Sequence, residues 1–209
     1  MKDTMNPDDF REEALAEQKI IRDLVVRDTE LYSLSFYECD FENCDFSKVS
    51  FMGCIFSDCR FVNCNLTLCR IPGCKLENVA FLDCKLVGID WCVAAWRKPH
   101  PKKKYPFTIK FENCALNYSV FIEMNLFQAK FIGCTLQEAG FEHADLSSGD
   151  FTESDLKGAV FRDTNLTGAD FSGARNYTIN ASCNILTKAK FSLPEALSLI
   201  YALDIELTE

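Results

Sequence analysis

The sequence predicts an all-β solenoid, in which short extended segments wind around a single apolar core. Three observations predict it: a large apolar residue recurs every five positions, a small residue recurs two positions before it, and the other positions are mostly polar. A period of five fits neither the helical stripe nor strand alternation. Because residues two apart in an extended segment share a face, each unit presents one inward pair before it turns a corner.

The large apolar residues stand at positions whose numbers end in 1 or 6. There are fifteen from Val26 to Trp96 and thirteen from Phe111 to Phe171, and none is polar. A unit of five residues cannot bury its inward pair alone, so the units must stack on one another. Between 111 and 171 phenylalanine and leucine alternate strictly. An even number of sides per turn would stack like on like, which favours four sides over three.

The small inward position holds ten of the twelve cysteines, and only Cys92 and Cys183 stand elsewhere. Structural zinc sites use closely paired cysteines such as C-x2-C, and the sequence contains no such pair. Reduced cysteine behaves as a small buried hydrophobe. We therefore expect these residues to fill the core rather than to hold a metal or form disulfides: Cys39, Cys44, Cys54, Cys59, Cys64, Cys69, Cys74, Cys84, Cys114 and Cys134.

Composition limits the classes of protein that this chain can represent. The 209 residues are 48% hydrophobic and carry a net charge of −9, which indicates a globular chain that does not bind nucleic acid directly. The apolar runs are too short to cross a bilayer, so no membrane association is expected. The acidic N-terminus lacks the pattern of a signal peptide, so we expect the cytoplasm, where thiols stay reduced.

The two ends depart from the repeat, and we expect each to cap the solenoid. Asn6-Pro7 indicates a cap and first turn, which predicts an N-terminal capping helix over 7–21 within a segment 1–23. At the other end Ser192 is a candidate N-cap, and it predicts a C-terminal helix over 192–209. An apolar stripe on that helix could plug the last coil or pair with a second copy: Leu193, Ala196, Leu197, Ile200 and Leu203.

The repeat region 24–191 is interrupted once, at 97–108. Pro101 and Pro106 would occupy large inward positions there, and proline cannot donate to a sheet ladder. This stretch is predicted to be an inserted loop. Residues 97–110 carry six basic and no acidic side chains, so the loop is basic on an acidic rod. Either it is a solubilising surface loop or it contacts a partner through Arg97, Lys98, His100, Lys102, Lys103, Lys104 and Tyr105.

Stretches such as "ADLSSGDFTESDLKGAVFRDTNLTGADFSGA" resemble the pentapeptide-repeat protein family. The resemblance implies a right-handed, four-sided (quadrilateral) β-helix with four pentapeptides per coil. One rod, one projecting loop and an apolar C-terminal helix are together similar to the quinolone-resistance, topoisomerase-protecting (Qnr-like) branch. That branch implies a homodimer formed through the C-terminal helix and a partner such as DNA gyrase or topoisomerase IV, with the loop contributing contacts.

Two functions remain open at the level of the sequence. The first is an acidic rod that mimics DNA and binds the basic groove of a type II topoisomerase. The second is a structural or protein-interaction scaffold with another partner. We expect neither an enzyme nor a cofactor, metal or small-molecule substrate, because no catalytic motif is present and His100 and His143 stand in the loop and at an outward position.

Overall fold

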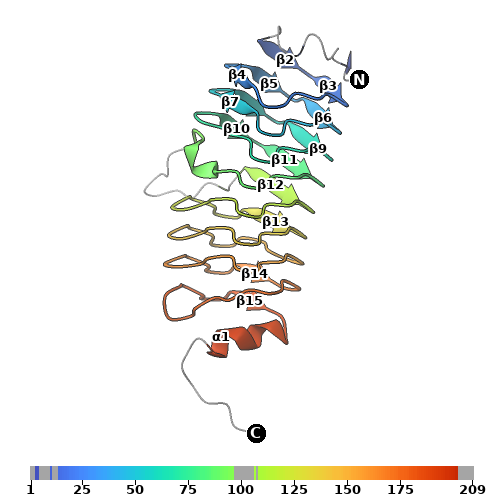
Figure 1. Ribbon diagram of the computed structural model, residues 1–209. Coiled ribbons are helices and arrows are strands. Elements are labelled where there is room, and N and C mark those ends of the chain that lie inside the picture. The colour runs from blue at the N-terminus through green and yellow to red at the C-terminus, as the bar shows by residue number, and fades with distance from the viewer. Residues whose placement is uncertain (1–2, 5–9, 11–13, 97–105, 107, 202–209) are drawn as a thin grey trace.

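The computed structural model describes residues 3–4, 10, 14–96, 106 and 108–201, and these wind into a solenoid of about eight turns (Figure 1). Its first strands are β1 (Asp3–Thr4), β2 (Leu15–Glu17), β3 (Lys19–Arg22), β4 (Glu30–Tyr32), β5 (Ser35–Tyr37), β6 (Asp40–Glu42), β7 (Ser50–Met52) and β8 (Ile55–Ser57). The later strands are β9 (Arg60–Val62), β10 (Lys75–Glu77), β11 (Val79–Leu82), β12 (Ile109–Glu112), β13 (Lys130–Ile132), β14 (Asp170–Phe171) and β15 (Lys190–Phe191). Three short helical segments are η2 (Trp91–Val93), η3 (Glu195–Leu197) and α1 (Ser198–Tyr201).

Each turn of the solenoid takes twenty residues. Phe41 pairs with Phe61 and Phe61 with Phe81 in parallel register, and most isolated bridges join residues twenty apart. Twenty residues in units of five give four sides. The prediction of a four-sided solenoid is confirmed, because like residues stack on like.

The four sides are named here by their inward large residues. Face A has Ile21, Phe41, Phe61, Phe81, Phe111, Phe131, Phe151, Phe171 and Phe191, and face B has Val26, Phe46, Leu66, Leu86, Leu116, Leu136 and Leu156. Face C has Leu31, Phe51, Ile71, Trp91, Phe121, Phe141 and Phe161, and face D has Ala16, Phe36, Phe56, Leu76, Trp96, Leu126, Leu146, Leu166 and Leu186. Since the faces follow one another in chain order, face A lies opposite face C.

Phenylalanine columns fill the core on faces A and C. Phe141 stacks between Phe121 and Phe161, with ring centroids 5.1 Å away on both sides. Its edge meets the rings of Phe131 and Phe151 from the opposite face. Offset-stacked and edge-to-face pairs are the favoured aromatic geometries, so the two columns support each other across the axis.

The corners of the solenoid have a left-handed backbone. Thirty of the described residues have positive φ, and all of them except Asn176 stand at positions ending in 3 or 8. Twenty-three of the thirty are not glycine, and asparagine and aspartate are common among them, as their tolerance of this conformation predicts. The residue before the large position supports the turn: the Oδ1 atoms of Asp145 and Asp150 accept hydrogen bonds from the backbone N–H groups of Ser147 and Thr152.

The interruption of the repeat is visible in the strand ladder. Phe81 on β11 pairs with Phe111 on β12, thirty residues later instead of twenty. Ten residues are therefore inserted between two turns that otherwise stack in register. The next pair, Phe111 with Phe131, again steps by twenty.

The predicted N-terminal helix over 7–21 is wrong in its described part, because residues 15–22 form strands β2 and β3. Ala16 and Ile21 occupy inward large positions, and both are buried. The five-residue repeat is hard to recognise here in the sequence, since Ala16 is small where the other units have a large apolar residue. Phe10 then covers the first turn, with its ring 5.5 Å from that of Phe36.

The predicted C-terminal helix is short in the residues that the structure describes, with η3 and α1 ending at Tyr201. Ser192 is not its side-chain cap: the Ser192 Oγ accepts a hydrogen bond from the backbone N–H of Gly173 instead. Just before the helix, the irregular stretch 175–190 stays in the solenoid by burying Tyr177 and Ile179. None of the helices in the described part of the chain has the length and apolar character needed to span a bilayer.

Candidate functional site

The cysteine-rich interior is a packing core. The ten cysteines at the small inward position are buried, Cys92 is exposed, Cys183 is partly exposed, and all twelve are free thiols. Burial raises the pKa of Cys69 to about 12, which keeps this thiol protonated and unreactive. The prediction that these residues fill the core is confirmed.

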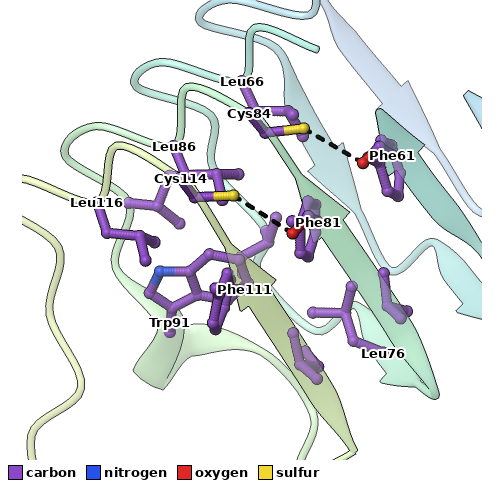
Figure 2. Packing of buried hydrophobic residues seen from close by; sticks show 14 of the residues in the cluster. Phe61, Leu66, Leu76, Phe81, Cys84, Leu86, Trp91, Phe111, Cys114 and Leu116 are labelled. Atoms are coloured by element: carbon purple, nitrogen blue, oxygen red, sulfur yellow. Dashed lines mark hydrogen bonds between the residues drawn. The ribbon is translucent and has the colours of Figure 1, made fainter. Parts of the chain in front are cut away.

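The buried thiols also act as hydrogen-bond donors. The Sγ atoms of Cys84 and Cys114 donate to the carbonyl groups of Phe61 and Phe81 in the preceding turn, at 3.4 and 3.3 Å (Figure 2). Ser154 continues the same column and donates to the Phe131 carbonyl in the same way. The side chain at this inward position therefore has to be small and is also a hydrogen-bond donor. Since these residues are buried, contacts with a partner must come from the outward residues.

Acidic and amide side chains follow one another along two corners of face A in the first four turns. One row is Gln18, Glu38, Asp58 and Asn78, and the other is Asp23, Asn43, Asn63 and Asp83. Neighbours within a row are hydrogen bonded: the Asn63 amide donates to Asn43, and the Asn78 amide donates to Asp58, at 2.9 and 3.0 Å. These contacts hold the side chains in line along the rod.

Other carboxylates pair with cations on the surface. Glu42 lies 2.6 Å from Arg22, and Asp170 lies 2.8 Å from Lys190. The later turns of face A also carry Lys110 and Lys130. Face A is thus acidic overall, but cations are interspersed in its N-terminal half as well, at Lys19, Arg22 and Arg60.

Asp45 on face B accepts hydrogen bonds from its neighbours, including one of 2.8 Å from the Arg27 Nε. Burial raises the pKa of Asp45, but hydrogen bonds from Arg27 and from the Ser47 backbone outweigh it and lower the pKa to about 2. A carboxylate whose pKa is lower in the folded state than in the unfolded state stabilises the fold at pH values above its unfolded pKa of about 4. This contribution to stability is lost as the pH falls toward 2.

We expect Asp45→Asn to lower the urea midpoint at pH 7 and to reduce the loss of stability on acidification. The Asn side chain keeps the turn, as Asn65 does one turn later through its bond to Thr67, but it has no charge to lose. Urea melts of both proteins at neutral and acidic pH measure the effect. Equal losses on acidification would contradict this role of Asp45.

The predicted partner-loop residues Arg97, Lys98, His100, Lys102, Lys103, Lys104 and Tyr105 lie outside the described residues. At the base of the insertion, Pro106 and Thr108 border a hollow of about 590 Å³. Corner side chains of Gln128 and Ser148 line it, and so does Lys130. The hollow is an open surface notch with both polar and apolar lining.

The C-terminal end exposes part of the predicted stripe. Leu193 is 77% exposed and Leu197 is 40% exposed, while Ala196 and Ile200 are half-buried. Leu199, which is not part of that stripe, packs against the core. Leu203 lies outside the described residues.

We find no grouped catalytic or metal-binding side chains in the part of the chain that the structure describes. No set of three His, Cys, Asp or Glu residues there could hold a metal ion. His143 stands at an exposed corner, with its Nδ1 3.8 Å from an oxygen of Asp163, which is also exposed.

The repeat and its geometry define the class of protein. A family model described as a pentapeptide repeat region matches residues 34–121, and one described as pentapeptide repeats in eight copies matches residues 139–175. The chain belongs to the pentapeptide-repeat family. No curated protein matches it in sequence.

Two solved structures illustrate the likeness of fold. HetL, a pentapeptide repeat protein involved in heterocyst differentiation regulation from the cyanobacterium Nostoc sp. strain PCC 7120, is 15% identical with a TM-score of 0.60, covering 85% of this chain and 86% of HetL. QnrB1, a plasmid-mediated fluoroquinolone resistance protein, is 18% identical with a TM-score of 0.54, covering 99% of this chain and 95% of QnrB1. At these identities the likeness concerns the fold alone.

Proposed function

We propose that this protein is a non-enzymatic binding rod, whose core sets the spacing of outward side chains and whose surface contacts a protein partner. The two acidic and amide-rich corner rows of face A carry this proposal. Their members repeat at the stacking distance of about 4.8 Å and are fixed by the hydrogen bonds between Asn63 and Asn43 and between Asn78 and Asp58. A narrow rod with such rows suits a groove lined by lysine and arginine.

Within this proposal, the first partner to test is a type II topoisomerase, DNA gyrase or topoisomerase IV, whose groove binds duplex phosphates. QnrB1, which shares this fold, is a fluoroquinolone resistance protein, and this supports the choice of partner. The rod would then act as a DNA mimic that protects the enzyme from quinolones. The alternative, a scaffold for another partner, is favoured by the cations that interrupt face A, such as Arg60 and Lys130.

A supercoiling assay tests this choice. We expect micromolar wild-type protein to change gyrase supercoiling or its inhibition by a quinolone. We expect the effect to fall when residues 97–106 are removed, since the loop is expected to contribute contacts. This variant should still fold, because excising ten residues restores the twenty-residue step between Phe81 and Phe111. Urea melts control for the fold. If neither protein changes inhibition or protection, the partner is not a type II topoisomerase.

We also propose that two copies associate through the C-terminal end, because Leu193 and Leu197 are exposed there beside the half-buried Ile200. Leu197→Glu should halve the molar mass measured by light scattering and leave the circular dichroism spectrum unchanged. Leu15→Glu, the same change at an exposed leucine of the N-terminal end, is the control. A wild-type protein that is monomeric at high micromolar concentration would overturn the proposal.

A further inference from the structure

One outward row on face C is apolar through five successive turns. The residues that follow its inward large positions are Tyr32, Met52, Pro72, Cys92 and Ile122. The matching row on the opposite face A mixes charged and apolar side chains: Arg22, Glu42, Val62, Leu82, Glu112 and Ile132. Among the described residues from 50 to 170, the exposed large hydrophobic side chains all lie on face C or its corners: Leu68, Val93, Tyr118, Ile122 and Val160.

Glycines open one side of this row. Gly53 and Gly73 stand at the corner next to Met52 and Pro72, and a Cβ added at Gly53 would meet no atom within 4 Å. The same corner position in neighbouring units carries Asp58 or Asn63, so the left-handed backbone alone does not require glycine here. Because Gly53 and Gly73 have no side chain, the apolar row is accessible from this corner.

Carboxylates border the row and outnumber the cations. Glu30, Asp90, Glu123, Glu138 and Glu142 stand on face C or its corners. Three cations stand there: the Lys48 Nζ lies 3.8 Å from Asp28, the Arg70 Nε donates to Ser50, and Arg162 is exposed one turn beyond Glu142.

Glu142 is the most informative of these carboxylates. Its Oε2 is buried and accepts no hydrogen bond from the described residues. It lies over Gly140, whose added Cβ would stand 2.9 Å from that oxygen and 3.6 Å from Ile122. A buried acceptor without a partner is costly, and a cation from another molecule would satisfy it at the end of the apolar row.

We propose that face C docks an amphipathic α-helix of a partner protein, with apolar side chains along one side and lysine or arginine beside them. Five turns stacked about 4.8 Å apart span about 19 Å, which matches a helix of about thirteen residues. A second copy of this chain would set carboxylates against carboxylates, so charge favours a basic partner. This surface is distinct from the acidic rows of face A and does not depend on a topoisomerase as the partner.

The probe is a fluorescent peptide of about fourteen residues, with leucine on one helical side and lysine on the other. Fluorescence anisotropy should show binding to the wild-type protein, and little binding when serine replaces leucine or glutamate replaces lysine. Ile122→Lys should weaken binding about tenfold or more. Ile132→Lys is the matched control, because it makes the same change in the same row of the opposite face, and it should change the Kd less than about twofold.

Glu142→Gln adds a test of the buried carboxylate and should also weaken binding, with thermal melts showing that each variant is folded. The proposal is overturned if Ile122→Lys and Ile132→Lys weaken binding equally, since the contact would then be unspecific charge attraction. It is also overturned if the leucine-to-serine peptide binds as well as the original. A drop in molar mass for Ile122→Lys would assign face C to a second copy instead.

Discussion

Phe141→Asp should leave the protein unfolded or insoluble at room temperature. Phe141 is 0% exposed, and the change removes its stacking on Phe121 and Phe161. Losing a buried phenylalanine costs about 3–5 kcal/mol, and an unpaired buried carboxylate adds several more. Since a domain is stable by only about 5–15 kcal/mol, little or no net stability remains.

Thermal and urea melts followed by circular dichroism measure this effect. Tyr118→Asp is the control, because Tyr118 is 63% exposed and the same exchange of an aromatic ring for a carboxylate should leave the fold intact there. A Phe141→Asp protein that melts like the wild type would show that position 141 faces outward, and the five-residue register assigned to the whole chain would be wrong.

Substitutions of Cys84 should show how its size and its hydrogen bonds contribute to the stability of the fold. Cys84 is 1% exposed; its thiol donates to the Phe61 carbonyl, and its sulfur accepts the backbone N–H of Cys64 at 3.4 Å. Cys84→Ser keeps both bonds, as Ser154 does in the same column, and should cost less than about 1 kcal/mol. Cys84→Leu loses both and overfills the column, so we expect about 3 kcal/mol or more.

Urea midpoints and their slopes give the free energies for this series. Cys92→Leu is the matched control, because Cys92 is exposed and the change should stay within about 0.5 kcal/mol. If Cys84→Ser destabilises the protein as much as Cys84→Leu, then neither small size nor the hydrogen bonds explain why cysteine is suited to position 84.

The repeat made most of the architecture predictable. Large residues at a five-residue spacing, such as Phe131 and Leu136, can be buried together only by stacking, and their alternation predicts four sides. The first turn was missed because Ala16 gives no size contrast and Lys19 stands where a small residue is expected. The predicted Ser192 cap was wrong because the Ser192 Oγ accepts a hydrogen bond from the backbone N–H of Gly173 instead.

Surface features were harder to predict, because they depend on which units share a face. Tyr32, Met52 and Pro72 are twenty residues apart and look unrelated along the chain. They form one row only once the length of a turn is known. The donor role of the cysteines was also hidden, since the sequence shows that they are small but not which carbonyl they face.

We propose that the acidic rows displayed by the stacked core bind a basic groove of a partner, and binding to gyrase at moderate salt tests this proposal most directly. Asp58→Lys reverses a charge in the N-terminal rows, and Glu153→Lys makes the same kind of change at a corner of face A near the other end. We predict salt-sensitive binding that Asp58→Lys weakens about tenfold and Glu153→Lys leaves within about twofold. Binding that neither variant changes, or no binding by the wild-type protein, would contradict the account.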